Sequence, residues 1–282
     1  MSAGGATASW VGRGGCAEMT LSAVVRELNV FPLKSAGGIS VGESQVTPGG
    51  LRHDREFMLV RPDRRHLSQR EVPRLALLRP SLAGATLIVD ALDAVTPLVH
   101  EPADGPVLDV TLHGMPCQGV DQGDDAADWF SAYLDTECRL VRFAGVRHTQ
   151  PGGGGRVTFA DGDPLHVLSR ESLDDLNQRL SEPLPMDRFR PNIVLEGLGP
   201  YGEDAVSALR IGEVEIELIA PCGRCVLTTI DQQTGVQGGE PLRTLATYRT
   251  QDFAGRREIM FGRLAIPRTF GMIATQDTAT AT

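Results

Sequence analysis

The sequence predicts a mostly β fold with some α-helix, that is, an α+β protein. Over residues 214–219, apolar and acidic residues alternate with the period of a half-buried strand. In the first half, short runs rich in Val, Ile and Leu are separated by turns with Gly or Pro, which is typical of a small barrel or sandwich. With 282 residues and 41% hydrophobic content, the chain can bury one large core or two modest ones.

The first half is expected to consist mainly of strands. These are predicted at residues 24–30, 56–60, 75–78, 86–89 and 107–112. A helix is predicted over 126–134, and its aromatic residues form an apolar stripe that is more typical of a core than of a cofactor site. A strand at 138–141 then leads into the second half.

In the second half, strands alternate with helices. Strands are predicted at 191–195, 208–219 and 225–230, with a last one at 271–277. Helices are predicted near 171–180 and 241–248, and Pro241 suits the first position of the second helix. We therefore divide the chain into a disordered extension over 1–20, a first domain over 21–125 and a second over 126–282.

Composition and charge exclude several classes of function. A formal net charge of −9 disfavours nucleic-acid binding or attraction to a membrane surface as the main role, because both need a basic field. No apolar run reaches the roughly 18–20 residues of a membrane span. The first 18 residues lack the apolar core of a secretory signal, and Met19 is an alternative start. Five cysteines without a disulfide framework predict a reducing, cytoplasmic location.

A C-x-x-C pair is the most informative motif. Cys222 and Cys225 flank Arg224 inside strand-like sequence, and the residues that follow are poor helix openers. This disfavours a thioredoxin-like pair at a helix N-terminus, and the scattered remaining cysteines disfavour a structural zinc site. Two packed core thiols are a common alternative. The functional interpretation is a thiolate beside a cation.

A basic segment stands about thirty residues upstream. Arg188, Arg190 and Asn192 immediately precede an apolar strand. Alternate residues of an extended segment project to the same side, and a guanidinium suits phosphate or a ring carbonyl. The pattern predicts an anion pocket. The alternative is that these arginines pair with nearby carboxylates at the surface.

A second basic site is indicated near the start of the chain. Lys34 and Ser35 follow a predicted strand and precede two glycines, in a turn where backbone N–H groups can approach an anion closely. Lys34 is the only lysine in the sequence. Its retention favours a compact ammonium contact that Arg cannot replace, with chance as the alternative.

Several of these motifs, in this order, resemble those of MOSC domain proteins. Residues 28–78 are similar to the β-barrel domain that precedes MOSC domains. Residues 163–235, with Phe-Arg-Pro-Asn at 189–192 and Cys-Gly-Arg-Cys at 222–225, resemble the subgroup that contains the mitochondrial amidoxime reducing component and its bacterial relatives. The resemblance implies a small N-terminal β-barrel-like domain packed on a MOSC-type β-barrel with flanking helices.

The resemblance also implies a molybdenum cofactor, Mo-molybdopterin. In relatives the second cysteine of the pair is a thiolate ligand of molybdenum. The matching residue here is Cys225, which the resemblance implies to be both catalytic and metal-binding. A soft thiolate suits this metal. Ser169 also has an alternative role as the N-cap of the predicted helix. Leu264 stands where the family has an aromatic contact. The residues that the resemblance assigns to the cofactor are Lys34, Ser35, Arg55, Ser169, Arg190, Asn192, Gly223, Arg224 and Cys225.

The implied function is reduction of N-hydroxylated or other N-oxygenated small molecules by a molybdenum-dependent oxidoreductase. We recognise no ferredoxin-like domain, so electrons are expected from a separate ferredoxin- or reductase-like protein. Two alternatives stay open. One is a persulfide carrier or transferase acting through Cys225, as in sulfurases that add a pyridoxal-phosphate module not recognised here; pyridoxal phosphate itself is only a family-level association. The other is a non-catalytic carrier of the cofactor.

Overall fold

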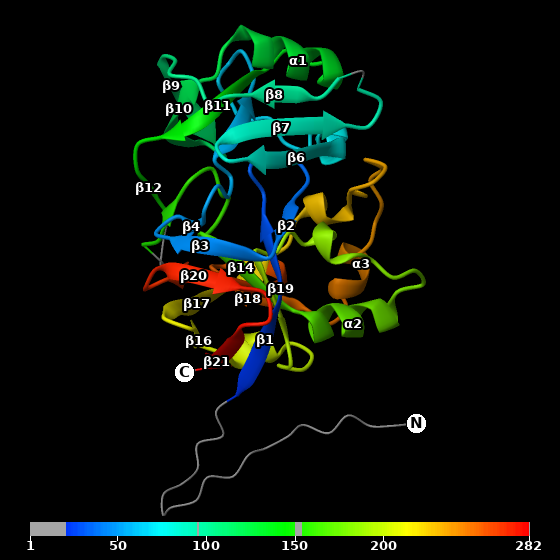
Figure 1. Cartoon of the computed structure of the whole chain (residues 1–282). Coiled ribbons are helices and arrows are strands. Elements are labelled where there is room, and N and C mark those ends of the chain that lie inside the picture. The colour runs from blue at the N-terminus through cyan, green and yellow to red at the C-terminus, as the bar shows by residue number, and fades with distance from the viewer. Residues whose placement is uncertain (1–20, 95, 150–153, 282) are drawn as a thin grey trace, which may run out of the picture.

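The computed structural model describes residues 21–94, 96–149 and 154–281. The extension predicted over 1–20 and the alternative start at Met19 lie outside these ranges. Strands dominate the described chain and helices are few, which confirms the predicted α+β class. Figure 1 shows two β units, one above the other, with the chain passing between them.

The lower unit in Figure 1 is a closed barrel of seven strands. The ring runs β14-β15-β1-β21-β16-β17-β19, and β19 pairs again with β14. All neighbours are antiparallel except β14 and β15. The strands of the barrel are β1 (Ser22–Val30), β14 (Leu165–Ser169), β15 (Ile193–Glu196), β16 (Ala208–Ile211), β17 (Val214–Gly223), β19 (Arg256–Pro267) and β21 (Thr278–Ala281).

Alternating sequence explains why these strands close around a core. In β17, Val214, Ile216 and Leu218 are buried, whereas Glu215 and Glu217 between them are partly exposed. The same inward set continues in β1, β15 and β16 as one hydrophobic cluster. Two short strands extend the barrel sheet outside the ring, β2 (Ile39–Val41) beside β1 and β18 (Thr250–Phe253) beside β19.

The upper unit consists of two antiparallel sheets and one helix. A helix, α1 (Asp124–Leu134), packs Phe130 and Leu134 against Leu140 in a second core, which confirms the predicted apolar stripe as core. The first sheet contains β5 (Phe57–Val60), β11 (Arg139–Ala144), β10 (Met115–Asp121) and β9 (Val107–Leu112); the second contains β6 (Leu78–Ala83), β7 (Thr86–Ala91) and β8 (Leu98–His100).

Smaller elements join and flank the two units. The helices α2 and α3 lie on one side of the barrel in Figure 1, as the flanking helices of the predicted fold. The remaining elements are β3 (Glu43–Thr47), β4 (Gly50–Leu51), β20 (Gly271–Ala274), β12 (Arg147–His148), β13 (Arg156–Val157), α2 (Arg170–Arg179), α3 (Leu242–Leu245) and the 3-10 helices η1 (Pro73–Leu77), η2 (Met186–Arg188), η3 (Gly202–Ala205) and η4 (Val226–Thr229).

The chain crosses between the units more than once. Strand β1 belongs to the first half of the sequence, yet it pairs with β15 and β21 in the barrel. Helix α1 and β11 follow residue 123 and pack with the upper unit. The domain boundary placed between residues 125 and 126 stays a prediction.

The strand predicted over 225–230 is wrong, because η4 occupies this segment. The hydroxyl of Thr228 donates to the carbonyl of Cys225 at 2.9 Å, and that of Thr229 donates to Val226 at 2.7 Å. These side-chain hydrogen bonds to the preceding backbone outweigh the weak preference of β-branched residues for strands. The C-x-x-C pair therefore spans the end of β17 and the start of a helical turn.

Other element boundaries also differ. The strand predicted over 75–78 is mostly the helix η1, whose N-terminal Pro73 favours a helical turn. The segment 208–219 is a hairpin of β16 and β17, because Gly212 adopts a left-handed turn with φ of 57°. The helix predicted over 241–248 is α-helical only in α3.

Candidate functional site

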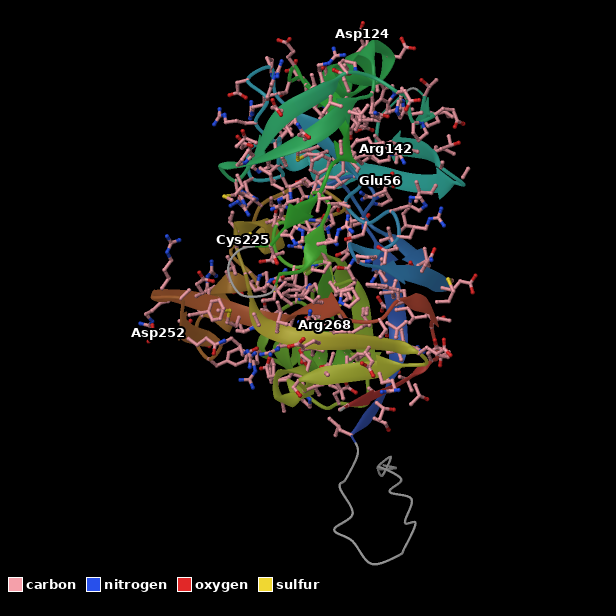
Figure 2. All side chains as sticks on the ribbon, turned by 90° about the vertical axis from the view of Figure 1, so that its left-hand side faces the viewer. Glu56, Asp124, Arg142, Cys225, Asp252 and Arg268 are labelled. Carbon is pink, nitrogen blue, oxygen red and sulfur yellow. The ribbon has the colours of Figure 1, made fainter. Side chains whose placement is uncertain are left out.

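A cavity of about 150 Å³ lies where the two units meet. Figure 2 labels Cys225 at this level, between the sheets above and the barrel below. Four cationic side chains but only two carboxylates line the cavity, in a chain whose net charge is −9. The residues that line it are Lys34, Ser35, Arg55, Ala160, Asp161, Gly162, Asp163, His166, Phe189, Arg190, Asn192, Cys222, Gly223, Arg224, Cys225, Leu227, Thr228 and Leu264.

Lys34 reaches the cavity from the turn that follows β1. Its Nζ donates to the carbonyl of Phe159 at 2.9 Å and forms an ion pair with Asp161, so two of its three N–H donors are used. Burial lowers the pKa of Lys34, while the charge of Asp161 opposes this effect. Ser35 beside it takes a left-handed backbone with φ of 66°.

Arg55 and Arg190 share one aromatic surface. Their guanidinium carbons lie 4.5 Å and 4.2 Å from the centre of the Phe31 ring. Arg55 forms an ion pair with the buried carboxylate of Asp54. Arg190 is only 9% exposed and donates to the carbonyl of Ala36, and it has no ion pair among the described residues. Arg190 thus contributes a buried positive charge that no carboxylate of the described residues contacts directly.

The burial of this charge changes the pKa of Arg190 itself. Burial, followed by repulsion from Arg55, lowers the pKa of Arg190 to about 9, and the charges of nearby carboxylates, Asp54 first, only partly oppose this effect. A buried cation without a carboxylate is costly unless an anion binds beside it. The geometry of Arg190 and Arg55 is therefore that of an anion-binding site.

Asn192 connects the cations to the barrel. Its Oδ1 accepts a hydrogen bond from Arg55 at 3.1 Å and another from the backbone N–H of His166 at 3.1 Å. Its Nδ2 donates to the carbonyl of Asn29 in β1 at 3.1 Å. Asn192 lines the cavity, and it also holds Arg55 and two strands in register.

The two cysteines differ in exposure. Cys222 is buried at the end of β17, and Arg224 donates to its sulfur at 3.0 Å. Cys225 is exposed, and Arg70 from the upper unit donates to its sulfur at 3.4 Å. The other guanidinium nitrogen of Arg224 donates to the carbonyl of Phe189 at 2.8 Å. The interpretation of both cysteines as packed core thiols therefore fails for Cys225.

Gly223 and Arg224 complete the pair. A Cβ at Gly223 would come within 2.5 Å of the carboxylate of Glu258, so glycine permits this close approach. The Nε of Arg224 is buried without a hydrogen-bond partner in the described chain. An unsatisfied donor beside an exposed thiol marks a place where a ligand with acceptor atoms would be stabilised.

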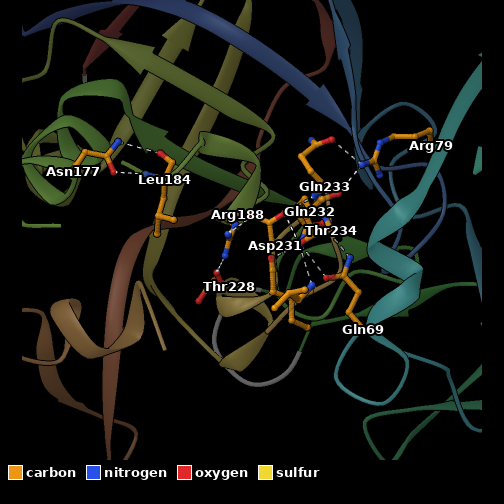
Figure 3. A network of polar contacts seen from close by, with 12 residues as sticks. Gln69, Arg79, Asn177, Leu184, Arg188, Thr228, Asp231, Gln232, Gln233 and Thr234 are labelled. Atoms are coloured by element: carbon orange, nitrogen blue, oxygen red, sulfur yellow. Dashed lines mark hydrogen bonds and ion pairs between the residues drawn. The ribbon is translucent and has the colours of Figure 1, made fainter. Parts of the chain in front are cut away.

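Arg188 does not share the position of Arg190. It ends η2 and forms a 2.6 Å ion pair with Asp231, while Arg190 has a left-handed backbone with φ of 55°. The prediction that both project from one extended strand is wrong for this reason. Figure 3 shows that Arg188 and Asp231 belong to a polar network around the loop after η4. In the same network, the side chains of Gln69 and Gln232 connect the two units through a hydrogen bond of 3.2 Å.

Ser169 is the one predicted cofactor residue that does not line the cavity. Its hydroxyl accepts from the backbone N–H of Ser172 at 3.1 Å and caps α2. It also lies 2.6 Å from the hydroxyl of Ser172, which donates to the buried Glu203. The structure thus gives Ser169 the capping role that was the alternative in the sequence.

Sequence reasoning missed His166, Asp161 and Asp163, which also line the cavity. The acidic pair in Asp-Gly-Asp-Pro before β14 was the available signal, because a strand that begins after such a turn presents polar groups at its end. His166 carried no signal, since it lies inside an apolar strand. The part of the chain that the structure describes contains no cluster of three or more His, Cys, Asp or Glu able to hold a metal.

His166 should make stability depend on pH. Burial, followed by the charge of Arg224, lowers the pKa of His166 from 6.5 to about 3. Below pH 6.5 the imidazole is therefore protonated in the unfolded chain but stays neutral in the folded chain. Its contribution is present above pH 6.5 and is lost as pH falls toward 3. Between pH 7 and pH 5 we expect a loss of about 2 kcal/mol in the free energy of unfolding. Urea denaturation of the native chain and of His166→Gln should show a smaller loss in the variant; equal losses would contradict the assignment.

A closed barrel and a second β unit that enclose a cationic cavity with one exposed thiol define the class of protein. A model described as MOSC N-terminal beta barrel domain matches residues 22–137, and one described as MOSC domain matches residues 154–279. The chain belongs to the MOSC family, as the resemblance predicted. No helix among the described residues is long and apolar enough to cross a membrane.

Relatives with established names cover most of the chain. Mitochondrial amidoxime-reducing component 1 of Mus musculus is 37% identical over 261 residues, which are 86% of this chain and 75% of that protein. Mitochondrial amidoxime reducing component 2 of Rattus norvegicus is 36% identical and covers 81% of this chain and 73% of its own length. Component 1 of Homo sapiens is 33% identical, over 90% of this chain and 81% of that protein.

Proposed function

We propose that this protein is a molybdenum-cofactor-dependent oxidoreductase that reduces N-hydroxylated small molecules, with electrons from a separate protein. The observation that carries the proposal is the placement of an exposed thiol, Cys225, in the same cavity as Arg190, a buried cation without a direct ion pair among the described residues. The names of the relatives, amidoxime-reducing components, supply the substrate class.

The residues present fit the cofactor. Its phosphate and pterin need cationic and hydrogen-bonding partners, which Lys34, Arg55 and Arg190 provide. Cys225 offers a soft ligand for the metal, and the free Nε of Arg224 offers a donor to the anionic sulfur ligands beside it. A reducing compartment such as the cytoplasm would keep Cys225 available as a free thiol.

The chemistry divides between the cofactor and the chain. When bound, the cofactor supplies a redox-active molybdenum that exchanges oxygen and electrons with the substrate. Overall, an N-hydroxylated compound takes up two electrons and two protons, the N–O bond breaks, and an amine-type product and water leave. The chain orients the reactants and provides the protons.

Asp161 and His113 form a hydrogen-bonded pair at the wall of the cavity. Asp161 lines the cavity, and its Oδ1 accepts a 2.8 Å hydrogen bond from Nε2 of His113, which is one-third exposed. Lys34 and His113 hold the pKa of Asp161 well below its usual range, although burial alone would raise it. The carboxylate therefore stays charged and accepts hydrogen bonds from Lys34 and His113.

Turnover of benzamidoxime tests the proposal. Protein from a cofactor-producing host, supplied with an artificial reductant, should convert benzamidoxime to benzamidine, as measured by chromatography. A cofactor carrier would contain molybdenum without turnover. A persulfide carrier, which the exposure of Cys225 also suits, would contain labile sulfur without molybdenum. Either result would overturn the oxidoreductase assignment.

A further inference from the structure

A second hollow adjoins the cavity. This outer groove has a volume of about 880 Å³ and shares Asp161, Gly162, Asp163 and Leu264 with the cavity. The two hollows therefore adjoin at these residues. The large apolar residues that line the groove are Leu112, Met115, Phe143, Val146 and Phe253, together with Leu264 at the junction.

The outer groove exposes large apolar side chains. Met115 is 43% exposed, Val146 62% and Phe253 38%, and they come from β10, the turn after β11 and β18. Apolar surface from three separate segments, gathered around one hollow, is a feature of ligand-binding grooves. Because the groove adjoins the cavity, it suits a ligand whose apolar part lies outside while its polar part reaches inside.

A polar group at the junction lacks a partner. Oδ1 of Asp163 is buried and has no hydrogen-bond partner among the described residues. Burial raises the pKa of Asp163, and the nearby Thr149 hydroxyl opposes this effect. The oxygen of that hydroxyl also forms no hydrogen bond of normal geometry among the described residues. A buried acceptor without a donor costs free energy that a ligand N–H would recover.

We propose that the outer groove binds the apolar body of the substrate, and that Asp163 accepts a hydrogen bond from the N–H of its head group. The substrate class is then N-hydroxylated amidines that carry an extended alkyl or aryl-alkyl substituent. This inference rests on the proposed function and deepens it. Substrates whose head group lacks an N–H, such as tertiary amine N-oxides, should have a lower kcat/KM.

A chain-length series tests the groove. The substrates are benzamidoximes with hydrogen, propyl or hexyl at the 4-position, turned over by the molybdenum-loaded protein with an artificial reductant. We expect kcat/KM to rise about tenfold or more from hydrogen to hexyl, because each methylene leaves water for an apolar wall. Equal kcat/KM across the series would contradict substrate binding in the outer groove, whereas the proposed reductase function would be unaffected.

A matched pair of variants locates the effect. Phe253→Ser should flatten the dependence on chain length, and Phe270→Ser should keep it. Phe270 is also exposed, at 52%, but it lines neither the groove nor the cavity. If both variants keep the native slope, the substituent lies elsewhere and the proposal is wrong.

Binding provides a readout that does not depend on turnover. Calorimetry with 4-alkylbenzamidines should show the same rise in affinity with chain length. Asp163→Asn should weaken all members by about fivefold and keep the slope, because a charge-assisted hydrogen bond becomes a neutral one. If benzamidoxime is not turned over but binding follows this pattern, the proposed reductase function is wrong and the outer groove is still a binding site for the apolar substituent. If benzamidoxime is turned over while Asp163→Asn binds as tightly as the native chain, Asp163 is not the acceptor.

Discussion

Replacement of Cys225 by Ala is expected to lower the molybdenum content of the purified protein by about tenfold or more, which is the range seen when a metal-site residue is removed. The reason is that Cys225 is the only exposed thiol among the described residues that lines the cavity. If the proposed cofactor binds here, the variant would keep the cationic side chains of the cavity but lack the thiolate proposed to hold the metal. Elemental analysis per mole of protein measures the effect directly.

Cys222→Ala is the matched control. Cys222 lies three residues away, but its sulfur is buried and accepts a hydrogen bond from Arg224. We expect this variant to retain most of its molybdenum. The melting temperatures of both apoproteins should stay close to that of the native chain if the loss of metal is not due to unfolding. Equal molybdenum in Cys225→Ala and the native protein would remove Cys225 from the ligand role.

Gly262→Ala is expected to destabilise the protein by about 3 kcal/mol, which combines left-handed strain with overpacking. Gly262 has φ of 81°, and a Cβ there would lie 2.4 Å from Nε2 of His166 and 2.9 Å from the carbonyl of Val167. These atoms belong to β14, which pairs with β19 where the barrel closes. In a chain of this size the melting temperature should fall by about 10 °C.

Gly212→Ala separates the two causes. Gly212 has φ of 57° in the turn between β16 and β17, with no atom within 4 Å of an added Cβ. Only backbone strain applies there, so we expect a cost of about 1 kcal/mol in urea denaturation. If Gly262→Ala lowers the free energy of unfolding no more than Gly212→Ala does, the His166 side chain moves aside and steric crowding between β14 and β19 does not contribute.

The site was predictable where a residue type could be recognised by its chemistry. Lys34, Arg190, Asn192 and Cys225 carry their charge, amide or thiol whatever the fold, and the structure brings all four to one cavity. Arg188 was misplaced, because a left-handed turn at Arg190 breaks the period on which the prediction depended.

Other members of the site depend on contacts between distant segments. His166 lies in an apolar strand, and only the approach of Arg224 and the closure of β14 on β19 bring it to the cavity. Ser169 is near the site in sequence, but its hydroxyl caps α2. No pattern within β14 distinguishes these outcomes.

By itself, the sequence determined the β-rich class, the inward face of strands such as β17 and the groups able to bind an anion and a soft metal, because periodicity and side-chain chemistry are local properties. Only the tertiary structure decided that β1 closes the barrel of the second half, that one cysteine of the pair is exposed, and that Arg190 is buried without a direct ion pair among the described residues. Those features arise from strand pairing and burial between residues far apart in the chain, which local sequence does not encode.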